Sequence, residues 1–122
     1  MVDVISDTSF LIHLATNRII NFSTLEVEIG KLEFVIPEIV TQELHHLSKD
    51  SSKKRIALET LDFIKNFKTN IISGKTADLG ILDFIEKNGG IVATMDKELK
   101  NNIKKIGGSV ISISNKKIVL EA

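Results

Sequence analysis

Short runs of β-branched residues alternate along this chain with longer segments whose apolar residues recur at helical spacing. The short runs predict strands at residues 2–6, 34–36, 70–73, 91–94 and 109–113. The longer segments predict helices at residues 10–17, 37–48, 53–66, 77–88 and 97–106. Pro37 is typical of a first helical turn, and the pairs Gly89-Gly90 and Gly107-Gly108 are typical of helix ends. The alternation favours an α/β fold, a three-layer α/β/α arrangement with a central, mostly parallel β-sheet.

Two stretches are harder to assign. Residues 20–31 have no clear period and fit either a helix or an irregular loop. Near the end of the chain, the polar segment 115–117 precedes the apolar run 118–120, so a short hairpin is expected at one edge of the sheet.

Composition then narrows the class of protein. The 122 residues carry 16 basic and 16 acidic side chains and no cysteine, which excludes disulfides and thiolate metal sites. The length fits one domain spanning residues 1–122. No apolar run approaches the ~20 residues of a membrane helix, so we expect no membrane partner and a cytoplasmic location. Because the net charge is zero, a nucleic acid would have to be held by a local basic patch.

Two aspartates follow predicted strands. Asp7 comes directly after the strand at residues 2–6, and Asp96 comes shortly after the strand at residues 91–94. In open α/β sheets the ligand sites lie beyond the carboxyl ends of the strands, which is where both side chains are expected. The alternative for each is a structural one, because aspartate is a common N-cap of a helix.

Two further acids fall within the apolar stripes of predicted helices. At about 100° per residue, Glu43 lies among the apolar residues of its helix, and so does Asp78, whereas Asp83 points to solvent. An inward carboxylate needs a cation, hydrogen-bond donors or a position at the rim of the core. A rim position for Glu43 and a first-turn or capping role for Asp78 are the structural alternatives.

Taken together, Asp7, Glu43, Asp78 and Asp96 are expected at one end of the sheet. Carboxylates gathered in one cleft repel one another, and their oxygens suit Mg²⁺ or Mn²⁺. Such an ion neutralises phosphoryl charge and activates water, so metal-assisted phosphodiester hydrolysis is the chemistry implied.

The chain resembles the PIN-domain family of metal-dependent ribonucleases over nearly its whole length. Four segments carry the resemblance: 6–11 (SDTSFL), 36–44 (IPEIVTQEL), 76–82 (TADLGIL) and 92–100 (VATMDKELK). The resemblance implies a metal-binding and catalytic quartet at Asp7, Glu43, Asp78 and Asp96. It also implies that Thr8, Ser9 and Thr94 support these acids. No pattern of the family aligns with residues 17–31.

The family cuts RNA, either as toxins of toxin–antitoxin pairs or as RNA-processing enzymes. The resemblance therefore implies RNA as substrate, an antitoxin or a ribosome-assembly protein as partner, and a homodimer. Residues 54–59 (KRIALE) and the stretch 97–120 are most similar to stand-alone archaeal members related to ribosomal-RNA processing factors.

Basic and histidine side chains supply further candidates. Lys97, Lys100 and Lys104 recur on the helix after Asp96, and Lys54 and Arg55 open another helix. These residues are candidates for RNA phosphate contacts, with a solvated helix face as the alternative. The three histidines, His13, His45 and His46, lack the further ligands that a zinc site needs.

Two other functions remain to be compared with the nuclease. A response-regulator receiver domain has a similar fold, but it needs a phosphoacceptor Asp after the third strand and a Lys after the fifth, where this chain has 73–75 (SGK) and Ser114-Asn115. A non-catalytic RNA-binding or assembly module of the same fold is the second alternative, against which the full set of four acids argues.

Overall fold

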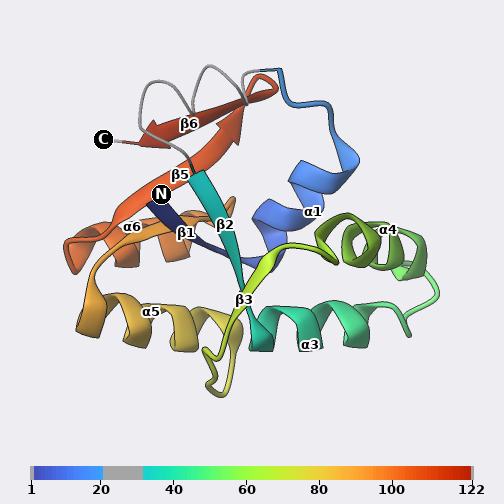
Figure 1. Ribbon diagram of the computed structural model, residues 1–122, viewed down its shortest axis with the longest axis horizontal. Coiled ribbons are helices and arrows are strands. Elements are labelled where there is room, and N and C mark those ends of the chain that lie inside the picture. The colour runs from blue at the N-terminus through green and yellow to red at the C-terminus, as the bar shows by residue number, and fades with distance from the viewer. Residues whose placement is uncertain (1, 21–31, 122) are drawn as a thin grey trace.

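A six-stranded sheet forms the centre of the molecule in the computed structural model, which describes residues 2–20 and 32–121. The strand order is β3-β2-β1-β4-β5-β6. The first five of these strands are parallel, and only β6 runs antiparallel, beside β5. The strands are β1 (Val2–Ser6), β2 (Leu32–Pro37), β3 (Lys68–Asn70), β4 (Ile91–Ala93), β5 (Ser109–Ser114) and β6 (Lys117–Glu121). The predicted mostly parallel sheet is confirmed (Figure 1).

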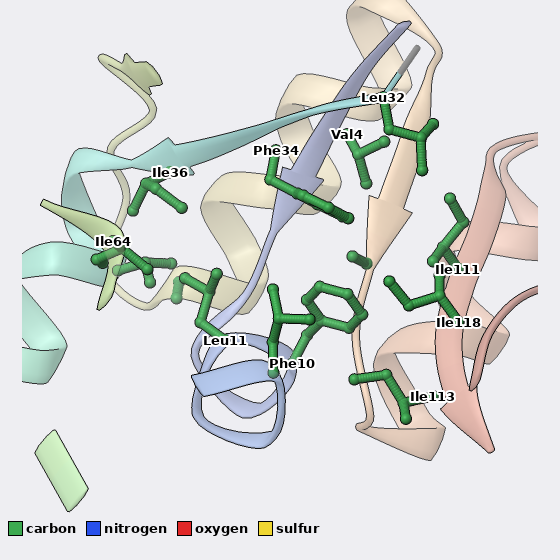
Figure 2. Close-up of a cluster of buried hydrophobic side chains, with 14 of the residues drawn as sticks. Val4, Phe10, Leu11, Leu32, Phe34, Ile36, Ile64, Ile111, Ile113 and Ile118 are labelled. Carbon is green, nitrogen blue, oxygen red and sulfur yellow. The ribbon is translucent and has the colours of Figure 1, made fainter. Parts of the chain in front are cut away.

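Helices cover both faces of this sheet, so the three-layer α/β/α arrangement is also confirmed. The helices are α1 (Thr8–Thr16), α3 (Glu38–Leu47), α4 (Lys54–Ile64), α5 (Ala77–Asn88) and α6 (Lys97–Lys105). One apolar cluster joins α1, α3 and α4 to the sheet and includes Leu11, Leu44 and Ile64 (Figure 2). A second cluster on the opposite face joins α5 and α6 to the sheet through Ile81 and Leu99.

The central strands are buried on both sides because their side chains alternate between the two clusters. In β1, Val4 belongs to the first cluster and Ile5 to the second, and β2 repeats this with Phe34 and Val35. The ring of Phe34 lies 5.5 Å from that of Phe10 at the start of α1. This contact helps seat α1 directly after β1, which is what brings residue 7 to the edge of the sheet.

Most predicted elements differ from the observed ones only by a few residues at their ends. The largest difference is the third strand, expected at residues 70–73 and observed at Lys68–Asn70. The β-branched pair Ile71-Ile72 suggested a strand, but Ile72 instead fills the second apolar cluster and Ile71 is 86% exposed. Most of the unassigned stretch 20–31, namely 21–31, lies outside the described residues.

The expected hairpin at the sheet edge is present as β5 and β6. Its turn consists of Asn115 and Lys116, with φ angles of 53° and 63°. Two successive residues with positive φ suit the right-handed twist of a hairpin, and asparagine tolerates this conformation well. Lys117, expected in the turn, is the first residue of β6.

Within the described residues, no helix combines the length and apolar character that a bilayer crossing requires.

Gly80 allows a close backbone approach between α5 and the loop that precedes it. A Cβ atom added at this position would lie 2.9 Å from the Ser73 carbonyl oxygen, and a backbone atom cannot easily give way.

Alanine in an open helix interior stabilises relative to glycine by roughly 1 kcal/mol, whereas overpacking costs about 1–3 kcal/mol. We therefore expect Gly80→Ala to lower the free energy of unfolding, measured in urea. Asn101→Ala, an exposed change on α6, should not lower it. An increase in stability for Gly80→Ala would contradict the close approach.

Candidate active site

The carboxyl ends of β1 and β4 open into a cleft of about 250 Å³. The structure brings all four predicted acids to this one cleft. Its lining consists of Asp7, Thr8, Ser9, Glu43, Thr76, Ala77, Asp78 and Asp96. The acids come from the starts of α1, α5 and α6 and from the middle of α3, so four separate segments converge there.

Asp7 is the only one of these acids that is buried, with 3% of its surface exposed. Its Oδ1 accepts hydrogen bonds from the Phe10 amide and the Ser9 hydroxyl, both at 2.9 Å. Its Oδ2 accepts a short hydrogen bond from the Thr94 hydroxyl. Asp7 is therefore both the N-cap of α1 and a carboxylate held in one position at the floor of the cleft.

Asp96 is the N-cap of α6 and is exposed at the mouth of the cleft. Its Oδ1 accepts from the amides of Glu98 and Leu99, at 2.9 and 3.1 Å. Within the described part of the chain, nothing donates to its Oδ2. The capping alternative is thus correct for Asp96 as well, and it leaves one oxygen available to a ligand.

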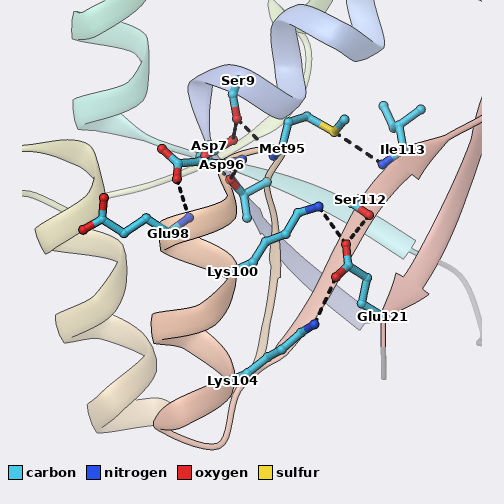
Figure 3. A network of polar contacts seen from close by, with 11 residues as sticks. Asp7, Ser9, Met95, Asp96, Glu98, Lys100, Lys104, Ser112, Ile113 and Glu121 are labelled. Carbon is cyan, nitrogen blue, oxygen red and sulfur yellow. Dashed lines mark hydrogen bonds and ion pairs between the residues drawn. The ribbon is translucent and has the colours of Figure 1, made fainter.

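Ser9 and Thr94 connect the two strand ends. The Ser9 hydroxyl, which donates to Asp7, accepts from the Met95 amide at 3.1 Å (Figure 3). The Thr94 hydroxyl, which donates to Asp7, accepts from the Asp96 amide at 3.0 Å. Each hydroxyl therefore uses both its donor and its acceptor capacity to fix Asp7 against the segment that carries Asp96.

Thr8 differs from these two residues. Its hydroxyl is buried and makes no hydrogen bond to any of the described residues, although Thr8 lines the cleft. The expectation that Thr8 supports an acid therefore does not hold, because its side chain reaches no carboxylate. A buried hydroxyl without a partner is costly, so this one lowers the stability of the fold beside the cleft.

Glu43 and Asp78 are exposed at the rim of the cleft, and not inside the core as their helical projections indicated. The projections identified the correct side of each helix. However, that side faces the cleft at these two positions, while Leu44 and Ile81 beside them are buried. The rim alternative is therefore correct for Glu43.

The acids influence one another electrostatically. Burial raises the pKa of Asp7 from 3.8 to about 6, although hydrogen bonds from Thr94, Phe10 and Ser9 partly oppose the increase. The pKa of Asp78 is also raised, first by partial burial and then by the charges of Asp96, Glu43 and Glu98. The cleft therefore disfavours the charged forms of Asp7 and Asp78, which a bound cation would favour.

The lining fits a hard divalent cation. It offers carboxylate and hydroxyl oxygens and contains no basic side chain, and it includes the unpaired Thr8 hydroxyl. Among the described residues, no three acidic or histidine side chains already converge as a ready metal site. Glu43 and Asp78 are exposed, and no hydrogen bond within the described structure holds their carboxylates, whereas Asp7 is fixed and Asp96 is held through its Oδ1.

The basic candidates fall into three groups. Lys97 is exposed beside Asp96 and has no ion-pair partner in the described structure. Lys100 and Lys104 instead contact Glu121 of β6, at 2.8 and 3.0 Å (Figure 3). The hydrogen bond from Lys100, followed by those from Ser112 and Lys104, lowers the pKa of Glu121 to about 2. Lys54 and Arg55, on α4, do not line the cleft.

None of the three histidines lines the cleft either. His45 borders a separate, mostly apolar groove between α3, α4 and β3, with Ile36 and Ile64 at its base. His46 lies beside Lys49 and Asp50 at the end of α3.

Replacing Asp7 by Asn tests the electrostatic cost of the cleft. A carboxyl whose folded pKa of about 6 exceeds its unfolded value destabilises the fold as pH rises from about 4 to about 6. In EDTA, the free energy of unfolding of Asp7→Asn relative to the wild type should therefore rise between pH 4 and pH 7, by at most about 3 kcal/mol. Asp83→Asn, on the solvent face of α5, should show no such trend. A constant difference for Asp7→Asn would mean that Asp7 ionises normally.

Comparisons with known proteins agree with this geometry. A family model described as a PIN-like domain matches residues 4–116. Among solved structures, the one described as the structure of the PIN domain endonuclease Utp24 superposes with a TM-score of 0.73 at 31% sequence identity. The match covers 98% of this chain and 90% of that one. Comparison with curated proteins finds no match. The resemblance noted in the four sequence segments is thereby confirmed, and the chain belongs to the PIN-domain family.

Proposed function

We propose that this protein is a divalent-metal-dependent endoribonuclease that hydrolyses RNA phosphodiester bonds. The observation that carries the proposal is the cleft at the strand ends, where three exposed carboxylates meet the buried carboxylate of Asp7. Membership of the PIN-domain family, and the likeness over 98% of the chain to a structure described as an endonuclease, support the same activity.

In this proposal the four acids hold Mg²⁺ or Mn²⁺ between them. When bound, the ion supplies neutralisation of phosphoryl charge and activation of water for attack. Asp7 provides the fixed ligand, because three hydrogen bonds hold its carboxylate in place. Asp96 provides its free Oδ2. Asp78 and Glu43 turn in from the rim and supply the remaining negative charge that balances the ion.

The remaining residues of the cleft position these groups or the substrate. Ser9 and Thr94 keep Asp7 and Asp96 at a constant separation by bridging the two strand ends. Lys97, at the start of α6, is placed to bind an RNA phosphate beside the cleft. Lys100 and Lys104 stabilise the junction of α6 with β6 through Glu121 and are not available for this task.

Two cellular roles fit this activity. As a toxin, the protein would be neutralised by an antitoxin that covers the cleft. As a processing enzyme, it would act with a ribosome-assembly partner. Nuclease activity is common to both roles, so the experiments below test the activity itself.

The products of cleavage distinguish this mechanism from metal-independent RNA cleavage. Since the attacking group is water, incubation of the protein with mixed single-stranded RNA in Mn²⁺ should leave 5′-phosphate and 3′-hydroxyl ends. EDTA should stop cleavage. Asp96→Asn should slow it by at least about 100-fold, while asparagine still caps α6. Asp83→Asn is the matched control and should cleave normally. Cleavage that persists in EDTA, or that leaves cyclic phosphate ends, would contradict the proposal; absence of any cleavage would favour a non-catalytic binding module.

The unpaired hydroxyl of Thr8 yields a second test. Valine has nearly the same shape as threonine and removes a buried polar group that has no partner, so Thr8→Val should keep or raise the free energy of unfolding by up to about 1–3 kcal/mol. We propose further that the Thr8 side chain rotates so that its hydroxyl contacts a group bound in the cleft, so the same change should slow cleavage. Thr8→Ser should retain activity. A Thr8→Val protein that is clearly less stable, or that is fully active, would show that the hydroxyl has no such role.

A further inference from the structure

We infer that Lys75 is an RNA-binding residue on the α5 side of the acidic cleft, opposite Lys97 on the α6 side. This inference rests on the proposed function, since it assigns how that function's substrate is held. In the sequence, Lys75 stands alone between Gly74 and Thr76 and belongs to no cluster of basic residues.

The need for such a residue follows from the charge of the cleft. Glu43, Asp78 and Asp96 are exposed at its rim and repel the phosphates of an approaching RNA strand. The lining holds no aromatic side chain on which a base could stack. Besides the ion proposed within the cleft, basic side chains beside it are therefore needed to hold the strand by its phosphates.

Three lysines of α5 and α6 already have carboxylate partners. Lys100 and Lys104 contact Glu121, and Lys87 contacts Asp83 at 3.1 Å. Among the described residues, the basic side chains that directly adjoin a lining residue in the chain are Lys75, next to Thr76, and Lys97, next to Asp96. Both are exposed, and neither has an ion-pair partner in the described structure.

The backbone that carries Lys75 is held in place on both sides. Before it, a Cβ atom at Gly74 would lie 3.1 Å from the Gly80 Cα, so the loop packs tightly against α5. After it, the Thr76 hydroxyl accepts from the Leu79 amide at 3.2 Å and caps α5. The Lys75 side chain therefore extends from a fixed point at the edge of the cleft, where Thr76 and Asp78 form the lining.

Binding measured as a function of salt tests this assignment independently of cleavage. All proteins carry Asp7→Asn to prevent hydrolysis, and the probe is a fluorescein-labelled single-stranded RNA of mixed sequence. Removing one phosphate contact should reduce the slope of log Kd against log salt by about 0.7. We expect this reduction for Lys75→Ala and for Lys97→Ala, and about twice the reduction for the double variant. Lys75→Arg should keep the wild-type slope.

Lys105→Ala is the matched control, because Lys105 is exposed at the far end of α6, about 12 Å along the helix from Lys97. It should leave the slope unchanged. In the cleavage-competent protein, Lys75→Ala should raise KM and leave kcat within about twofold, as expected for a residue that binds substrate and transition state equally.

The outcomes separate this inference from the proposed function. If Lys75→Ala keeps the wild-type slope while the wild-type protein cleaves RNA, the assignment of Lys75 is wrong and the nuclease proposal stands. If the slope falls as expected but no chain cleaves RNA, Lys75 binds RNA and the nuclease proposal fails. If no protein in the set binds the RNA and the wild-type protein cleaves none, both are wrong.

Discussion

The burial of the Asp7 carboxylate is the constraint on which the rest of the site depends. This group lies at the carboxyl end of the central strand β1, and burial raises its pKa to about 6. Three hydrogen bonds, from Phe10, Ser9 and Thr94, compensate part of that cost and leave the group fixed. The acids of the cleft also repel one another: the pKa of Asp78 is raised first by partial burial and then by the charges of Asp96, Glu43 and Glu98. Desolvation and like-charge repulsion of the carboxylates therefore destabilise the fold, and a divalent cation bound in the cleft would offset both effects.

The same aspartates serve the fold and the site. Asp7 and Asp96 each cap a helix that starts at the carboxyl end of a strand, and capping uses Oδ1 in both cases. Structural and functional roles are therefore not alternatives at these positions. The parallel sheet allows one aspartate to cap a helix and to line the cleft, because adjacent parallel strands end at the same edge and the next helix begins there. Thr94 then connects the two caps by donating to Asp7 and accepting from the Asp96 amide.

The layers of the fold, most of its elements and the four acids of the cleft could be predicted from the sequence, because hydrophobic period and residue order are local properties. What could not be predicted depends on contacts between distant segments. Lys100 and Lys104 were candidates for RNA phosphate contacts because they recur with Lys97 on one helix. In the structure both form ion pairs with Glu121, which joins α6 to the last strand. The position of β3 was missed because Ile72 fills a core site without joining the sheet. The role inferred for Lys75 likewise depends on the packing of its loop against α5, which places it next to Thr76 of the cleft lining.

The central claim is that the four carboxylates form one divalent-cation site. Anomalous diffraction from crystals grown with Mn²⁺ tests it most directly, because the signal locates manganese without reference to activity. The account predicts an anomalous peak in the cleft within ligand distance of Asp7 and Asp96, with Glu43 and Asp78 turned toward it, and no peak in crystals of Asp7→Asn. The absence of an anomalous peak from the cleft of the wild-type protein would contradict the claim. An equally strong peak in crystals of Asp7→Asn would contradict it as well.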